Sequence, residues 1–192
     1  MNPAATKTAA LILWAALQLG VLFLLGLAAL FKFVQPGGLF VPGAHPVVDV
    51  VAASIAAAPV LLGLFVYGRN VVFGPSPNSR VVRSVSKRLA ESPASADPDR
   101  FAAGVVALLD GNFRGASILA WALGEAGALL AVCVTLGRGF QTPEVAVVAL
   151  WFLSMAISAP TQSRIDRYRR RLLEHSGLNK AQTETLLAQA GD

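Results

Sequence analysis

Four long runs of apolar residues constrain this chain more than any other feature. They cover residues 9–31, 47–68, 116–137 and 145–163, and about 20 apolar residues in a helix suffice to cross the hydrocarbon core of a bilayer. Only 14% of the residues are charged and 55% are hydrophobic, whereas soluble domains carry about 25% charged residues. The sequence therefore predicts an all-α fold, a four-helix transmembrane bundle that forms a single membrane domain.

The first run is interpreted as a permanent span rather than a cleaved signal peptide. The apolar part of a signal peptide has about 7–15 residues and ends in a small-residue cleavage site. Residues 9–31 form a longer run that leads into the sequence LFKF. We therefore expect this segment to remain as the first membrane helix.

The basic residues are unevenly placed around the four runs. Of the 16 Lys and Arg residues, all but Lys32 and Arg138 lie in the N-terminal tail, in the loop 69–115 or in the tail 164–192. Basic residues near the ends of spans stay in the cytoplasm. We expect a multipass protein of the cell inner (cytoplasmic) membrane with both termini cytoplasmic. The net charge of +5 then reports topology, and no nucleic-acid partner is expected.

The loop 69–115 contains two stretches with apolar residues at helical spacing. In SRVVRSVSKRLAES, valines alternate with basic residues, which predicts a short amphipathic helix. Such a helix either lies in the membrane interface or packs on the protein with a solvated face. A linker follows, and residues 99–109 are expected to form a second helix that ends at Gly111.

The tail is expected to continue the fourth span as a helix as far as Gly177. Asn179 and Gln182 have the spacing of a capping box, which predicts a last short helix. The sequence RYRRR lies where anionic lipid head groups would meet it. The residues that we expect to contact head groups or a partner are Arg164, Arg167, Arg169, Arg170, Arg171, Arg83, Lys87 and Arg88.

One acid lies deep inside a span. Glu125 is about ten residues into the third run, which places it near the bilayer centre at 1.5 Å per residue. A charge costs at least about 2.5–3.5 kcal/mol there, and the spans contain no Lys or Arg to pair with it. We therefore expect a protonated Glu125 that donates a hydrogen bond, with Gln18 of the first run as its partner. The contact is either a bond between helices or part of a proton or ion site.

Small residues indicate how the helices meet. They recur every fourth position at Ala116, Ala120, Gly124 and Ala128 in the third run and at Ala52 and Ala56 in the second. Such stripes let backbones approach closely in membranes. We interpret them as packing surfaces.

Residues for catalysis or metal binding are sparse. His45 and His175 are expected on opposite sides of the membrane, and the only cysteine is Cys133. A metal site would lack ligands, and no phosphate-binding glycine loop is present. We therefore expect no enzyme activity, no cofactor and no metal.

The sequence ILAWALGEAGALLAVCVTLGRG resembles the carboxylate-bearing helix of rotary ATPase proteolipid subunits, in which small residues flank a Glu. The resemblance covers residues 118–139 and implies a proton-binding role for Glu125. Over its whole length the chain is similar in layout to small bacterial four-span membrane proteins of unassigned function, with a last span that ends in a Pro-Thr step, here Pro160-Thr161. That resemblance implies no activity.

Two functions are consistent with these features. The first is a non-enzymatic scaffold or accessory subunit of a membrane complex, with the lipid bilayer and anionic head groups as its surroundings. The second is a proton- or ion-coupled transport element that uses Glu125. Because one acid and four spans make a small transporter, the second function implies a homo-oligomer or a larger complex.

Overall fold

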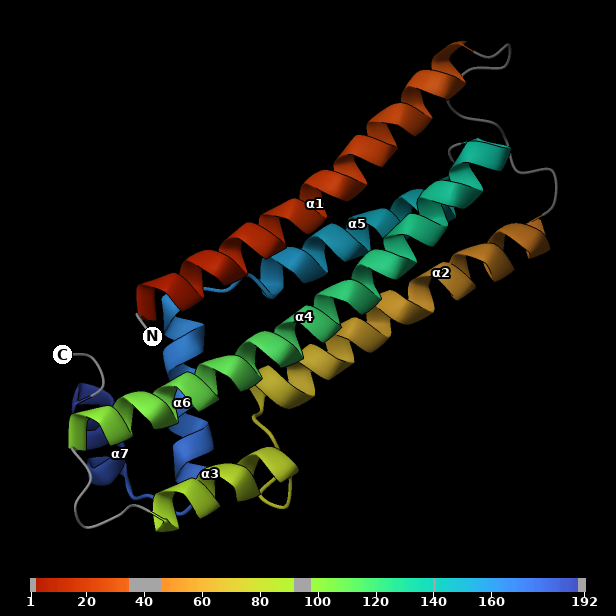
Figure 1. The fold of residues 1–192 in the computed structure, drawn as a ribbon. Coiled ribbons are helices and arrows are strands. Elements are labelled where there is room, and N and C mark those ends of the chain that lie inside the picture. Colours follow the sequence, from red (N-terminus) through yellow and green to blue (C-terminus); the bar gives the residue numbers. More distant parts are fainter. Residues whose placement is uncertain (1–2, 35–45, 92–97, 140, 190–192) are drawn as a thin grey trace. The chain divides into compact units, whose positions relative to one another are not determined.

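A computed structural model describes residues 3–34, 46–91, 98–139 and 141–189 (Figure 1). Every regular element within these ranges is helical, which confirms the all-α class for this part of the chain. The expected outer loop at 35–45 and the linker at 92–97 lie outside the described residues. The elements are α1 (Pro3–Val34), α2 (Pro46–Tyr67), the π-helical turn η1 (Gly68–Val72), α3 (Arg80–Ala90), α4 (Pro98–Arg138), α5 (Thr142–Ile157), α6 (Gln162–His175) and α7 (Lys180–Gln189).

Three helical segments are long and apolar enough to cross a membrane. They are Thr8–Val34, Val47–Val72 and Pro98–Leu136. The helix α5 has 16 residues, and it passes the same test only together with α6, to which it is bent by 69°. The structure thus has three helices suited to a membrane, or four if the bent pair forms one span, which is consistent with a membrane protein.

The chain divides into two compact units. We call residues 12–66 and 118–159 the apolar unit, and residues 1–11, 67–117 and 160–192 the charged unit. The long helix α4 contributes residues to both. Each unit is described separately below.

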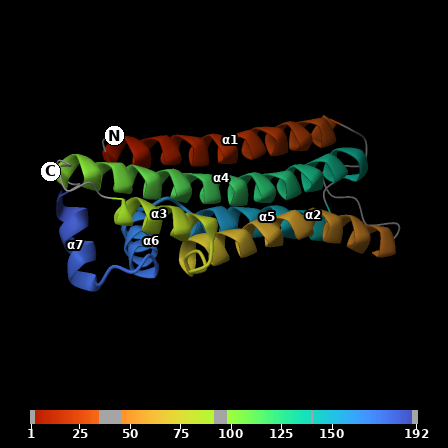
Figure 2. The same ribbon diagram turned by 60° about the horizontal axis from the view of Figure 1, so that its bottom comes forward.

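In the apolar unit, α2 and the second half of α4 lie side by side (Figures 1 and 2). A Cβ atom added to Gly63 of α2 would lie 2.5 Å from the carbonyl oxygen of Ala120. One added to Gly127 of α4 would collide with the carbonyl oxygen of Ala56. Backbones meet directly here, as the stripes of small residues predict.

Tryptophans join α5 to the other helices of the apolar unit. The indole N–H of Trp14 in α1 donates to the carbonyl oxygen of Met155 at 2.9 Å. The indole N–H of Trp121 in α4 donates to the Ser158 hydroxyl at 3.0 Å. Trp151 is fully buried, and its ring fills the space beside Gly124, whose added Cβ would lie 3.1 Å from Trp151 Cδ1. Trp14, Trp121 and Trp151 are therefore packing residues.

In the charged unit, α6 packs against α3, α7 and η1. Val82 and Val85 of α3 are buried, and the Ser86 hydroxyl donates to the carbonyl oxygen of Ser176 at 3.2 Å. At the same end of α6, the His175 ring nitrogen Nδ1 lies 3.1 Å from the carbonyl oxygen of Pro75. Because the protein covers the apolar face of α3, the packing alternative for this amphipathic helix is favoured over the interfacial one.

Two predicted helix ends are confirmed. Gly177 has φ +99°, and the N–H of Leu178 donates to the carbonyl oxygen of Leu173 at 3.3 Å, which is the Schellman pattern that ends a helix at glycine. The capping box also forms. The N–H of Asn179 donates to Gln182 Oε1 at 3.0 Å, and the N–H of Gln182 donates to Asn179 Oδ1 at 2.9 Å.

Other predicted ends are wrong. Gly111 does not stop a helix, because α4 runs through it without interruption; one glycine costs a helix only about 1 kcal/mol. The fourth apolar run does not continue as one helix to residue 163, because α5 ends at Ile157 and α6 begins after Pro160. Proline lacks the N–H that a continued helix needs. At the start of α5, Gln141 is the N-cap residue, whereas a threonine such as Thr142 is the residue type that usually caps a helix.

Glycine substitutions test the backbone contact between α2 and α4. Gly127→Ala should lower the free energy of unfolding by about 1–3 kcal/mol, because the new methyl group overpacks the contact. Gly111→Ala is the matched control in the same helix, since nothing lies within 4 Å of its added Cβ, and it should raise stability by up to about 1 kcal/mol. Thermal unfolding of the purified protein in detergent measures both, and equal effects would contradict the close approach.

Candidate functional site

A buried ion pair joins α4 to α6 in the charged unit. Arg169 Nε donates to Asp110 Oδ1 at 2.7 Å, and Arg169 Nη2 donates to Asp110 Oδ2 at 2.7 Å. Arg169 is 7% exposed and Asp110 is 2% exposed. Two parallel bonds of this kind match the planar guanidinium to the carboxylate, so the pair fixes the register of α6 against α4.

An aromatic contact lies next to this ion pair, at the residue that precedes Arg169 in α6. The rings of Tyr168 and Phe113 meet edge to face with centroids 5.5 Å apart, and both residues are buried. Burial raises the pKa of the Tyr168 hydroxyl to about 12, so this side chain is neutral at physiological pH. The inner face of α6 is therefore a packed structural surface.

The structure separates Arg169 from the other basic residues that were expected to contact head groups or a partner. Arg169 is enclosed by the protein, whereas Arg164 and Arg171 are half-buried. Two of the exposed residues have acidic neighbours: Lys87 Nζ lies 3.6 Å from Glu91, and Arg170 Nε lies 3.0 Å from Glu184. The exposed members of the set are Arg83, Lys87, Arg88, Arg167 and Arg170.

In the apolar unit, the structure places Glu125 beside α1 but does not pair it with Gln18. Glu125 Oε1 lies 3.9 Å from the position of a Cβ atom on Gly20, which is an ordinary van der Waals distance. Within the described ranges, no hydrogen bond joins Glu125 to Gln18. Both side chains are half-buried. The proton-carrying role of Glu125 stays a prediction.

Three buried polar residues without a predicted site role lie near the start of α2 and at the start of α5. Asp49 near the start of α2 is 5% exposed, and Gln141 at the start of α5 is 7% exposed. The Gln141 amide, oriented to donate, lies 2.9 and 3.1 Å from the two Asp49 carboxylate oxygens. Glu144, one turn further along α5, is 1% exposed. The sequence signal for all three is an acid or amide close to the end of an apolar run.

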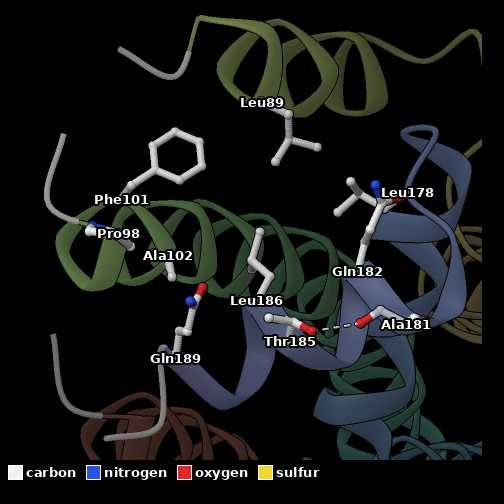
Figure 3. Close-up of a pocket in the computed structure, with 10 residues that line it drawn as sticks. All are labelled: Leu89, Pro98, Phe101, Ala102, Leu178, Ala181, Gln182, Thr185, Leu186 and Gln189. Atoms are coloured by element: carbon white, nitrogen blue, oxygen red, sulfur yellow. Dashed lines mark hydrogen bonds between the residues drawn. The ribbon is translucent and has the colours of Figure 1, made fainter. Parts of the chain in front are cut away.

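A groove of about 510 Å³ lies in the charged unit among α3, α4 and α7 (Figure 3). Leu89, Phe101 and Leu186 give it an apolar wall, and no charged residue lines it. The Thr185 hydroxyl at its edge donates to the carbonyl oxygen of Ala181 at 2.9 Å. The groove therefore offers neither an acid–base pair nor a set of metal ligands. Elsewhere in the described ranges, no three His, Cys, Asp or Glu side chains gather as metal ligands would.

Substitution of Asp110 tests the buried pair. Asp110→Asn removes the buried counter-charge of Arg169 and leaves only the partly exposed Asp166 beside it, which should cost about 3–5 kcal/mol of stability. Asp166→Asn is the control, because Asp166 Oδ1 also contacts Arg169, at 3.2 Å, but its side chain is 39% exposed; an exposed pair is worth at most about 1 kcal/mol. Denaturant or thermal unfolding in detergent measures the difference, and equal losses would contradict a structural role specific to Asp110.

Comparison with protein-family models, with curated proteins and with solved structures gave no match to this chain.

Proposed function

We propose that this chain is a four-span protein of the cell inner membrane, with both termini in the cytoplasm. In this proposal it acts as a non-enzymatic scaffold or accessory subunit of a membrane complex. In this proposal α5 alone is the fourth span. The charged unit, which includes α6, is the cytoplasmic part and presents basic side chains to anionic lipid head groups. The distribution of Lys and Arg around the apolar runs supports this orientation.

The observation that carries the proposal is the division of roles among the arginines of α6. Arg169 turns inward to Asp110 and is enclosed, while Arg167 on the same helix is exposed. Arg83 and Arg88 of α3 are also exposed, and α3 packs on α6. We call Arg83, Arg88 and Arg167 the basic surface. Their charges stand on helices that buried contacts hold in place.

The physical basis for lipid binding is electrostatic. An anionic membrane surface attracts each nearby Lys or Arg by about 1 kcal/mol. Side chains on a fixed helix lose less freedom on binding than side chains on a flexible tail. A basic surface on packed helices thus suits a protein that holds its cytoplasmic part against head groups.

The proton- or ion-coupled alternative relies on Glu125. Its carboxyl has no hydrogen-bond partner among the described residues and lies beside Gly20. An intramembrane acid without a counter-charge is a candidate for proton binding. This alternative stays a prediction and implies an oligomer or a larger complex.

Charge substitution tests the basic surface. Replacing Arg83, Arg88 and Arg167 together by Gln removes three charges and should weaken binding of phosphatidylglycerol at least about tenfold. The matched control replaces the same three residues by Lys, which keeps the charge and should keep most of the affinity. Native mass spectrometry of the full chain in detergent, titrated with phosphatidylglycerol, measures this. Equal affinity of the Gln variant and the wild type would overturn the proposal.

A further inference from the structure

A second cavity, of about 360 Å³, lies within the apolar unit and opens beside α5. Binding pockets for small molecules have volumes of about 300–1,000 Å³, so this cavity has room for a ligand. It is formed by α1, α4 and α5. Its lining residues are Leu25, Thr135, Glu144, Val145, Val148, Ala149 and Phe152.

The polar and apolar lining residues are ordered along the helices. Glu144 lies in the first turn of α5, which begins at Thr142, and Thr135 lies in the last turn of α4, which ends at Arg138. Phe152 is eight residues further along α5 than Glu144, which corresponds to about 12 Å at 1.5 Å per residue. The cavity therefore has a polar end at the helix termini and an apolar end deeper in the bundle, which is the polarity of an amphiphile.

The polar end contains an acid without a partner. Glu144 is 1% exposed, and neither of its carboxyl oxygens has a hydrogen-bond partner in the described part of the chain. Burying an unpaired carboxylate costs several kcal/mol. The carboxylate form of Glu144 needs a positive charge beside it, and the first turn of α5 supplies only the partial charge of the helix dipole. The neighbouring amide of Gln141 is directed to Asp49 and so does not compensate Glu144.

Thr135 supplies an acceptor at the same end. Its hydroxyl donates to the carbonyl oxygen of Ala131 at 2.9 Å, so its own oxygen can still accept a hydrogen bond. Glu144 and Thr135 thus bring acceptor groups to the polar end of the cavity, and no lining residue supplies a cation. The missing group is a positively charged donor.

We propose that this cavity binds an amphiphile with a primary ammonium head and an apolar chain. The ammonium donates to the Glu144 carboxylate and to the Thr135 hydroxyl oxygen, which neutralises the buried charge. The apolar chain lies along Leu25, Val148 and Phe152. A carboxylate head would be repelled by Glu144, and an alcohol head would leave its charge unbalanced. Both a membrane lipid with an ethanolamine head and a free long-chain amine carry this chemistry.

The test uses the full chain in nanodiscs of phosphatidylcholine, a lipid that has no primary ammonium. Decylammonium is titrated in, and Tm is followed by tryptophan fluorescence, with decanol as the neutral control of the same chain length. At about 100 times Kd, a ligand of the folded state should raise Tm of the wild type by about 5 °C. Decanol should give no comparable rise.

Two variants assign the effect to the cavity. Glu144→Gln keeps the side-chain shape and removes the charge, and Ala149→Phe fills the apolar end while Glu144 remains. Each substitution should lower the affinity for decylammonium at least about tenfold. Leu153→Phe is the control for Ala149→Phe, because Leu153 lies on the same helix, is 57% exposed and does not line the cavity; it should bind as the wild type does.

The outcomes separate the two ligand sources and decide the proposal. Exchange of phosphatidylcholine for phosphatidylethanolamine should raise Tm of the wild type, but not of Glu144→Gln, if the lipid is the ligand. A response to decylammonium alone would identify a free amine. An equal rise with decanol, or an unchanged decylammonium effect in both Glu144→Gln and Ala149→Phe, would overturn the proposal, because binding would then be partition into the bilayer.

Discussion

The hydrocarbon core of a bilayer offers no hydrogen bonds to a polypeptide backbone, so a chain that enters it must satisfy every N–H and C=O group internally. Helices do this within one segment, and the described part of this chain is built from them. In lipid, apolar side chains gain little from leaving their solvent, so helices associate through close packing. Gly63 and Gly127 provide that packing by bringing the backbones of α2 and α4 into contact.

Buried acids in the two units differ in whether they have a partner. Asp110 and Arg169 compensate each other's charge with two hydrogen bonds of 2.7 Å, so this pair has a structural role. Glu144 is buried as completely but has no partner in the described residues. A compensated pair needs no further partner, whereas the unpartnered Glu144 beside a cavity is the basis of the proposed ammonium ligand.

Local features of the fold could be predicted from the sequence because their causes are local. The capping box of Asn179 and Gln182 and the helix end at Gly177 depend on a few neighbouring residues, and both formed as predicted. The apolar runs predicted the three helices that are long and apolar enough to cross a membrane, and also the region of α5. The break at Pro160 was missed because apolar composition alone was followed to residue 163. Gly111 was given too much weight, since the packing of α4 outweighs the small cost of one glycine.

The sites were harder to predict because they depend on contacts between distant residues. Arg169 and Asp110 are 59 positions apart, and nothing in RYRRR distinguishes the one arginine that turns inward. The place of Glu144 just after Pro143 is typical of the first turn of a helix, where it lies in α5, but this position does not reveal its burial. Glu125 was singled out by its depth, yet its expected bond to Gln18 is not present in the described residues. Depth in a span can be counted along a sequence, whereas pairing requires the fold.

The central claim is that four segments cross the membrane and leave the charged unit in the cytoplasm. Reporter fusions along the chain test it most directly, because an enzyme reporter such as alkaline phosphatase is active on only one side of the inner membrane. Fusions after Gly43 and after Thr142 should report the outside, and fusions after Ser95 and after Asp192 should report the cytoplasm. A cytoplasmic signal after Thr142 would contradict the four-span account.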